Sequence, residues 1–251
     1  MELGLSDRVY VLTGATKGLG FATARCLVAD GARVIVSSRS QESVDKAVAE
    51  LGSNAAGIVA DLADPGTPDA LVAAAHDRFG RLDGALISVG GPPAGGPLDA
   101  TDEQWTAAFN SVFLGAVRMA RTVAGVLGEG GAIAFVLSTS VRTPLNGLAV
   151  SNGLRPGLAM WAKDLADALG PRGVRVVSLL PGSILTDRGH QLLAGKPDPA
   201  KAKADTEARI PLRRMGEPAE FGRVAAFVLS PAASYLTGIA LPVDGGILRA
   251  L

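Results

Sequence analysis

Short runs of apolar, mostly β-branched residues alternate with longer helical stretches along the chain. Strands that alternate with helices are typical of βαβ units, which build a parallel sheet covered on both faces. The longest helical stretches are Asp102–Leu127 and Ser151–Leu169, and the segment Gly189–Ile210 is inserted late. The apolar runs predict strands at Val9–Thr13, Arg33–Ser37, Ala56–Ala60, Gly84–Ser88, Ala132–Ser138, Arg175–Leu179 and Ile239–Val243. The pattern predicts a doubly wound α/β fold, with a parallel seven-stranded sheet and helices on both faces, in a single domain over residues 1–251.

Two loops that are rich in glycine and proline interrupt this pattern. Gly90–Gly96 has the sequence GGPPAGG and follows the fourth predicted strand, where it favours an irregular turn. Gly182–Pro199 follows the sixth strand and mixes glycine, proline and charged residues before a helical run, as a lid over a ligand would. In a doubly wound sheet, ligands bind beyond the carboxyl ends of the strands, where both loops would lie. The alternative is that both loops are simple connectors.

A glycine-rich turn directly follows the first predicted strand. The turn Thr13–Gly20 has the sequence TGATKGLG and leads into the helical run Phe21–Ala29. Three glycines let the backbone approach a pyrophosphate, which then lies on the amides and positive dipole of the helix N-terminus. Glycines alone would also fit a structural turn, but the strand before and the helix after favour a dinucleotide site of the Rossmann type. The predicted contacts are Gly14, Thr16, Lys17, Gly18, Leu19 and Gly20.

The end of the second predicted strand indicates which dinucleotide binds. An acidic residue there would accept hydrogen bonds from the adenosine ribose, but this chain has Ser37-Ser38-Arg39. Arg39, with Lys17 in the glycine-rich turn, supplies cations that would pair with a 2′-phosphate. We therefore expect Ser38 and Arg39 to contact the cofactor, and the cofactor to be NADP(H). The alternative places both cations on a solvated surface.

Composition and charge narrow the class of protein. The chain has 24 Lys plus Arg and 24 Asp plus Glu, so the charge balance indicates no polyanion-binding surface and no nucleic acid partner. The N-terminus is acidic and no run of about 18 apolar residues occurs, so we expect a cytoplasmic protein without a membrane partner. Two distant histidines and one cysteine make no metal site. Cys26 fits a small buried helix position and is given no role.

Four landmarks together carry a family resemblance. They are T-G-x-x-x-G-x-G at Thr13–Gly20, Asp61-Leu62 after the third strand, Pro181-Gly182 with Thr186 after the sixth, and Tyr235–Gly238 leading to Val243–Gly246. In this layout the chain resembles a classical short-chain dehydrogenase/reductase, close to 3-oxoacyl-(acyl-carrier-protein) reductases, over essentially its whole length. The resemblance implies the following further cofactor contacts: Asp61 and Leu62 at the adenine, Ser88 and Gly90 where the family has Asn-Ala-Gly, and Pro181, Gly182, Ile184 and Thr186 at the nicotinamide.

The family's catalytic set is Asn-Ser-Tyr-Lys, and each member has a physical role. The tyrosine transfers a proton, and the lysine one helical turn later lowers the pKa of that phenol and contacts the nicotinamide ribose. The serine orients the substrate oxygen, and the asparagine supports a proton-relay water. The resemblance places Ser138 at the serine, Ser151 at the tyrosine and Arg155 at the lysine. Val112 stands at the asparagine, with Asn110 two positions early.

The missing tyrosine changes the chemistry that the site supports. The chain has two tyrosines, Tyr10 in the first strand and Tyr235 in the C-terminal landmark, so no small shift of the alignment supplies one. An aliphatic hydroxyl is a far weaker acid than a phenol, and arginine stays protonated at neutral pH. Ser151 therefore donates a hydrogen bond without being a ready general acid. Arg155 either clamps ribose hydroxyls or stabilises a developing oxyanion.

Three functions stay open on this evidence. The one that we expect is an NADP(H)-dependent reductase of a ketone or 3-oxoacyl-type carbonyl, because the nicotinamide-end landmarks are intact. Ser138, Ser151 and Arg155 would polarise the carbonyl, while water or a group on the substrate delivers the proton. The second is a non-redox enzyme of the same fold, catalysing dehydration or enolisation. The third is a catalytically silent subunit or a cofactor sensor.

Three other polar residues complete the candidates. His190, in the late loop, is the best substitute acid because imidazole titrates near neutrality, although exposure is the commoner fate of such a histidine. His76 is expected on a helix surface away from the cofactor. Arg142 would face either an anionic substrate or solvent, and solvent is favoured.

By resemblance the two longest helices form the faces through which the family builds dimers and tetramers. We therefore expect a homo-oligomer, and we expect it to act on a small molecule.

Overall fold

The computed structural model describes residues 2–249 and contains a seven-stranded sheet. All neighbouring strands run parallel, in the order β3-β2-β1-β4-β5-β6-β7. The strands are β1 (Val9–Leu12), β2 (Arg33–Ser38), β3 (Ala55–Val59), β4 (Gly84–Ile87), β5 (Ala132–Val136), β6 (Arg175–Pro181) and β7 (Ile239–Val243). These are the seven runs predicted from the sequence, with shifts of no more than two residues at any end. The doubly wound prediction is confirmed.

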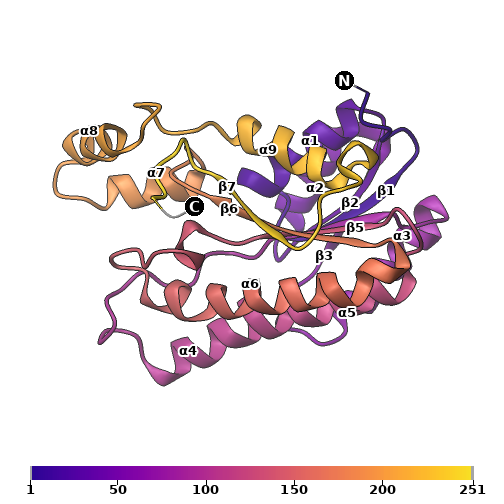
Figure 1. Ribbon diagram of the computed structural model, residues 1–251, viewed down its shortest axis with the longest axis horizontal. Coiled ribbons are helices and arrows are strands. Elements are labelled where there is room, and N and C mark those ends of the chain that lie inside the picture. The colour runs from indigo at the N-terminus through magenta and orange to yellow at the C-terminus, as the bar shows by residue number, and fades with distance from the viewer. Residues whose placement is uncertain (1, 250–251) are drawn as a thin grey trace.

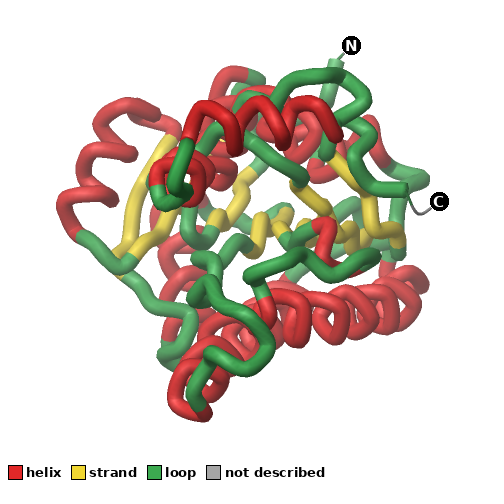
Figure 2. Tube along the Cα trace, turned by 90° about the vertical axis from the view of Figure 1, so that its left-hand side faces the viewer, coloured by secondary structure: helices red, strands yellow, loops and turns green. Residues whose placement is uncertain are grey.

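Helices form a layer on each face of the sheet (Figures 1 and 2). The elements of one layer are α1 (Gly18–Ala29), α2 (Gln41–Leu51) and α9 (Pro218–Leu229), and those of the other are α3 (Thr67–Phe79), α5 (Gly115–Val126) and α6 (Ala149–Leu169). Side chains alternate along each strand, so Val9 and Val11 join one core while Tyr10 and Leu12 join the other. Because both faces of the sheet are covered, most positions in the strands are apolar.

The predicted helix Asp102–Leu127 is interrupted. It consists of α4 (Asp102–Ala108), a π-helical stretch over Phe109–Leu114, and α5. Gly115 donates its backbone N–H to Asn110 O across this stretch, and its Cα lies so close to the carbonyl of Leu62 that a side chain there would clash. π-Helical turns of this kind occur frequently at functional sites. Here the turn brings Val112 to the carboxyl edge of the sheet.

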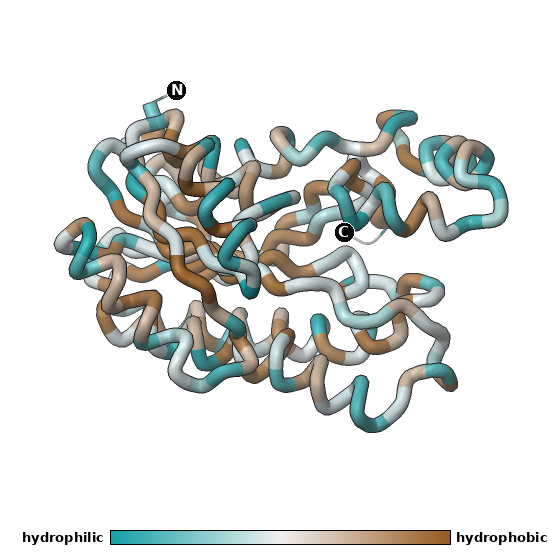
Figure 3. The backbone as a smooth tube through the Cα atoms, turned by 180° about the vertical axis from the view of Figure 1, so that it is seen from behind, coloured by the Kyte–Doolittle hydropathy of each residue, from teal (hydrophilic) through white to brown (hydrophobic). Residues whose placement is uncertain are grey.

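The late segment folds into two helices, α7 (Asp187–Ala194) and α8 (Pro199–Arg209), which project from the left of the view in Figure 1. The expectation that His190 lies in a loop is wrong, because Thr186 accepts a hydrogen bond from Gly189 N at 3.1 Å and starts α7. Helix α8 is mostly exposed, and hydrophilic colours dominate it in Figure 3. Within residues 2–249, no helix has both the length and the apolar character needed to cross a membrane.

Candidate active site and dinucleotide cleft

A cavity of about 500 Å³ opens at the carboxyl ends of β1 to β4. This is the edge where doubly wound sheets bind ligands. The cavity is lined by the glycine-rich turn, by the ends of β2 and β3, by the loop after β4, and by one side of α4 and the π-helical turn. Its lining residues include Gly14, Thr16, Lys17, Ser38, Arg39, Asp61, Leu62, Ser88, Gly90 and Val112. Nine of the predicted cofactor contacts therefore surround one cavity, together with Val112.

The glycine-rich turn has a backbone that only glycine adopts without strain. Gly14 and Gly18 have φ of 57° and 59°, in the left-handed region that L side chains disfavour. A Cβ on Gly14 would lie 2.8 Å from Ser88 O, and one on Gly20 would lie 2.8 Å from Ala15 Cα. Helix α1 then begins without a capping side chain, so its first amides stay free for an anion. The turn therefore fits a pyrophosphate group.

Hydrogen bonds between the first two loops fix the shape of the cavity. Thr13 Oγ1 donates to Ser88 O at 2.7 Å and accepts from Ser88 N at 2.9 Å. These bonds hold the segment after β4 against the glycine-rich turn through its backbone. The segment thus stays in place although the side chain of Ser88 is shorter than the family's asparagine.

The adenosine end of the cavity carries positive charge. Lys17 and Arg39 are exposed at its rim, and neither forms an ion pair with any residue in 2–249. Asp61 is the one acidic residue in the lining, and its Oδ1 accepts from Ala63 N at 3.0 Å. The two free cations and the absence of an acid at the end of β2 fit a 2′-phosphate.

The predicted nicotinamide-end segment follows β6 and contacts the glycine-rich turn. A Cβ on Gly18 would lie 3.7 Å from the methyl carbon of Thr186, so the two segments lie close to each other. Gly182 lies against Asp244, where a Cβ would be 2.6 Å from the Asp244 Cβ. Ile184 is buried. Glycine is therefore required at position 182 for the approach of the C-terminal segment.

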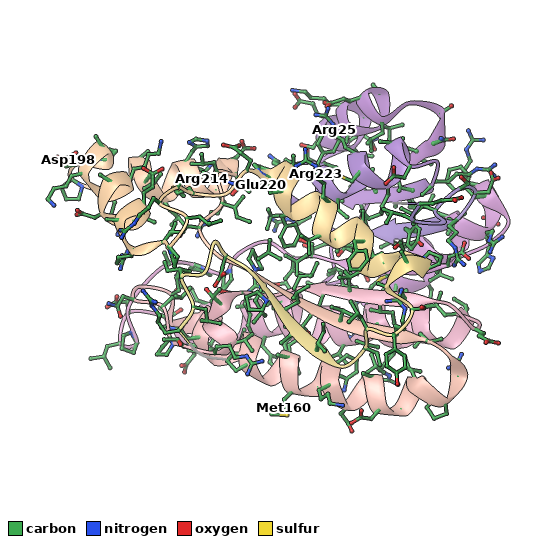
Figure 4. The ribbon with its side chains drawn as sticks, turned by 45° about the horizontal axis from the view of Figure 1, so that its top comes forward. Arg25, Met160, Asp198, Arg214, Glu220 and Arg223 are labelled. Carbon is green, nitrogen blue, oxygen red and sulfur yellow. The ribbon has the colours of Figure 1, made fainter. Side chains whose placement is uncertain are left out.

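An ion pair stabilises the far side of this segment. Ile184 forms an isolated bridge with Gly216, and Arg214 donates to both carboxylate oxygens of Glu220 at 2.7 and 2.6 Å; these two side chains lie together in Figure 4. The hydrogen bond from Arg214 lowers the pKa of Glu220 to about 2. A second cavity of about 600 Å³ lies on this side, lined by Ile184, Arg214, Glu220 and neighbouring residues.

The candidate catalytic serines are joined through a residue that the sequence analysis missed. Strand β5 ends at Val136, and Ser138 is half-buried and accepts a hydrogen bond from Ser140 N at 3.1 Å. The hydroxyl oxygen of Ser140 lies 3.4 Å from that of Ser151. Both Ser140 and Ser151 are buried. The only signal for Ser140 was the hydroxyl-rich run Ser138-Thr139-Ser140.

Arg155 lies one helical turn beyond Ser151 on α6 and is 6% exposed. Its Nη1 donates to Val136 O at 2.9 Å and to Leu137 O at 2.8 Å. Burial removes water from the guanidinium and lowers its pKa to about 10. Arg155 therefore remains a cation at neutral pH, held against the carboxyl end of β5.

Two loops form a connected wall beside the serines. Gly95 N donates to Gly147 O at 2.8 Å, and Ala149 N donates to Gly95 O at 3.1 Å. The side-chain amide of Asn152 holds Leu145 through two bonds, accepting from Leu145 N at 3.0 Å and donating to Leu145 O at 2.9 Å. The loop after β4 is therefore irregular, as predicted, but tied to the start of α6.

The remaining candidates lie away from these contacts. His190 on α7, His76 on α3 and Arg142 are exposed, and Cys26 is half-buried on α1. Within the described part of the chain, no three His, Cys, Asp or Glu residues come together as potential metal ligands.

Comparison with known proteins identifies the family. Residues 14–248 match a family model described as enoyl-(acyl carrier protein) reductase. The human dehydrogenase/reductase SDR family member 4 is 33% identical over 249 residues, which cover 96% of this chain and 88% of that protein. The chain belongs to the short-chain dehydrogenase/reductase family.

Solved structures agree with this assignment. L-Sorbose reductase from Gluconobacter frateurii, complexed with NADPH and L-sorbose, has a TM-score of 0.91 and 28% identity over the full length of both chains. A 3-ketoacyl-(acyl-carrier-protein) reductase from Brucella melitensis, complexed with NADH, has a TM-score of 0.85 and 28% identity over 97% of this chain and 99% of its own. A short-chain oxidoreductase from Pseudomonas aeruginosa PAO1, described as containing an atypical catalytic centre, has a TM-score of 0.91 and 26% identity over 98% and 99%.

Proposed function

We propose that this protein is an NADP(H)-dependent oxidoreductase that reduces a ketone or 3-oxoacyl-type carbonyl without a catalytic tyrosine. The observation that carries the proposal is the short separation between Gly18 and Thr186, since a Cβ built on Gly18 would lie 3.7 Å from the Thr186 methyl carbon. It brings the predicted pyrophosphate turn next to the predicted nicotinamide-end segment. A protein that had lost redox chemistry would need no such arrangement at the reactive end of the cofactor.

The preference for NADP(H) rests on charge at the adenosine end. Arg39 and Lys17 lie at the rim of the cavity without acidic partners among the described residues. The planar guanidinium of arginine forms bidentate hydrogen bonds with a phosphate. Among the similar structures, one holds NADPH and another holds NADH, so the proposal for this chain depends on these two side chains.

The chemistry at the carbonyl depends on positioning and charge rather than on a phenol. When bound, the reduced nicotinamide supplies a hydride. Ser138 and Ser151 donate hydrogen bonds towards the substrate oxygen, and Arg155 provides a fixed positive charge for the oxyanion that develops there. Water or a group on the substrate supplies the proton. The relative with an atypical catalytic centre supports the idea that the fold accommodates such a change.

An activity assay with a set of carbonyl compounds tests this function. Purified protein with NADPH is mixed with ketones and 3-oxoacyl thioesters, and cofactor oxidation is followed by absorbance. We expect turnover of at least one substrate, with a loss of about 10²-fold or more in Ser138→Ala, as for removal of an oxyanion donor. His190→Ala is the matched control and should keep the activity. NADPH binding without oxidation by any substrate would instead favour a cofactor sensor or a non-redox enzyme.

We also propose a homo-oligomer formed through the face of α4, α5 and α6. Phe109 and Met160 are 43% and 73% exposed on this face, and Figure 4 shows Met160 at the outer side of the molecule. Phe109 stacks on Phe113 with ring centroids 5.4 Å apart. Exposed apolar residues on neighbouring helices favour a protein partner. Sedimentation of the wild type and of Met160→Glu tests the proposal.

A cytoplasmic location stays a prediction from the sequence.

A further inference from the structure

Three successive residues near the start of α6 make three different contacts. Ser151 lies against Ser140, with 3.4 Å between their hydroxyl oxygens. Gly153 lies against Trp105, because a Cβ on Gly153 would be 2.7 Å from a carbon of the Trp105 ring. Asn152, between them, is half-buried and bonds the loop that follows β5. The proposed chemistry uses Ser151 but gives no role to Asn152.

The side chain of Asn152 holds the backbone of one residue at both of its polar groups. Its Oδ1 accepts from Leu145 N at 3.0 Å, and its Nδ2 donates to Leu145 O at 2.9 Å. A carboxamide carries both a donor and an acceptor, so it can bond a peptide unit as a neighbouring strand would. Leu145 O also accepts from Leu148 N at 3.2 Å. The turn over residues 145–148 is therefore closed on itself and fixed to α6.

This turn in its place holds the loop that follows β4. Gly147 O accepts from Gly95 N at 2.8 Å, and Gly95 O accepts from Ala149 N at 3.1 Å. Residues 88–93 of the same loop line the dinucleotide cavity and end two positions before Gly95. The two bonds of Asn152 thus support one wall of the cavity through two connected loops.

The order of the strands places this wall away from the adenosine end. The sheet runs β3-β2-β1-β4-β5, and the candidate adenosine contacts Arg39 and Asp61 follow β2 and β3. Residues 88–93 follow β4, and Ser138 follows β5. An extended dinucleotide with its adenosine over β2 and β3, and its pyrophosphate at the turn after β1, has its other half on the side of β4.

We propose that Asn152 is a positioning residue for the nicotinamide half of the cofactor, a proposal that rests on the NADP(H) function above and adds a residue to its site. Asn152 touches no cofactor atom and acts through the turn 145–148 and Gly95. With both loops held, the wall is formed before the ligand arrives, so binding does not have to order it. The adenosine half is bound by the glycine-rich turn, Lys17 and Arg39, and does not depend on Asn152.

Calorimetric titration with two ligands tests the proposal without turnover. NADP⁺ is compared with adenosine 2′,5′-bisphosphate, which carries the 2′-phosphate but no nicotinamide. Asn152→Ala should weaken NADP⁺ binding about tenfold, as expected for the loss of two hydrogen bonds, and leave the bisphosphate unchanged. Asn146→Ala, at an exposed position of the same turn, is the matched control and should change neither affinity. Equal losses for both ligands, or no loss for NADP⁺, would overturn the proposal.

A second variant disturbs the same turn without touching Asn152. Gly147 has φ of 75° and nothing within 4 Å of its Cβ, so Gly147→Ala acts through backbone strain alone. It should weaken NADP⁺ and spare the bisphosphate, as Asn152→Ala does. Gly80→Ala, with φ of 77° and equally open space, is its control. If Asn152→Ala does not fold, Gly147→Ala decides, because equal losses for both ligands contradict the proposal.

Hydrogen exchange on the protein without ligand separates this proposal from the proposed function. Asn152→Ala should speed exchange of the Gly95 and Ala149 amides about tenfold. The amide of Ser88, which is bonded to Thr13, should exchange as in the wild type. Unchanged exchange at Gly95 would show that Asn152 does not hold the wall. If the wild type binds neither ligand, the NADP(H) function is wrong, and exchange at Gly95 still decides whether Asn152 holds the wall.

Discussion

The two ends of the cleft are built by different means. At the adenosine and pyrophosphate end, the fit comes from the backbone: the positive φ of Gly14 and Gly18, and the bonds of Thr13 to the backbone of Ser88. At the proposed carbonyl end, it would come from the side chains of Ser138, Ser151 and Arg155. A backbone arrangement cannot change without disturbing the loops packed on it, whereas a side chain on α6 can be exchanged with the helix intact. The function that we propose therefore keeps the dinucleotide end of the fold and changes only the side chains at the carbonyl end.

The largest expected effect comes from restoring the usual groups at the carbonyl end. The double variant Ser151→Tyr with Arg155→Lys should raise the rate of neutral-ketone reduction by about 10²- to 10⁴-fold, the usual contribution of a positioned general acid. NADPH oxidation with a ketone panel measures it. The double variant Ser151→Phe with Arg155→Lys is the matched control, because it adds the ring without the hydroxyl. Equal rates in both variants would show that the pocket no longer fits a phenol.

At the other end, a single methyl group should disrupt cofactor binding. Gly14→Ala places a Cβ 2.8 Å from Ser88 O on a residue with φ of 57°. Backbone strain of about 1–2 kcal/mol and the displaced loop should together weaken NADPH binding about 100-fold, measured by fluorescence titration. Gly80→Ala is the control, since Gly80 has φ of 77° and nothing within 4 Å of its Cβ. A similar loss of affinity in both variants would contradict the backbone account.

The charge at the adenosine rim should set which dinucleotide binds. Arg39→Gln should weaken NADPH binding by about tenfold or more, the contribution of a charge-assisted hydrogen bond, and leave NADH binding unchanged. Arg78→Gln, at an exposed position of α3, removes the same charge elsewhere and should change neither affinity. Equal losses for NADPH and NADH in Arg39→Gln would mean that Arg39 does not contact the 2′-phosphate.

The smallest expected effect concerns the ion pair behind the nicotinamide-end segment. The hydrogen bond from Arg214 lowers the pKa of Glu220 to about 2. The ionised carboxylate therefore stabilises the folded state at pH values above its unfolded pKa of about 4.3. This stabilisation is lost as the pH falls towards 2. Glu220→Gln should lower the melting temperature slightly at pH 7, and the difference from the wild type should shrink between about pH 4.5 and 2. A difference that is constant over this range would contradict the pairing. Glu207→Gln, in the longer 3.8 Å pair with Lys203 on α8, serves as the control.

The sequence predicts the parts of this molecule that depend on local pattern. The strands follow from continuous apolar runs, and the glycine-rich turn follows from the need for positive φ and close approach at Gly14 and Gly18. Helix α7 was missed because Gly189 weakens the helical pattern, whereas the hydrogen bond from Gly189 N to Thr186 starts the helix. The π-helical turn was missed because it depends on the packing of Gly115 against Leu62.

The carbonyl end was only partly predictable. The positions of Ser138, Ser151 and Arg155 follow from the family resemblance, but their partners depend on how α6 packs against the end of β5. The 3.4 Å contact between Ser140 and Ser151 and the two bonds from Arg155 to strand-end carbonyls join residues that are 11 to 19 positions apart. No local pattern specifies such contacts, and they determine the charge that a ligand meets.

We propose an NADP(H) site that is intact although the family's usual proton donor is missing. Calorimetric titration of the wild-type protein with NADPH, NADP⁺, NADH and NAD⁺ tests it most directly. We expect saturable binding of NADPH and NADP⁺, about tenfold or more tighter than that of NADH and NAD⁺. Absence of binding by all four dinucleotides, or tighter binding of NADH than of NADPH, would contradict it.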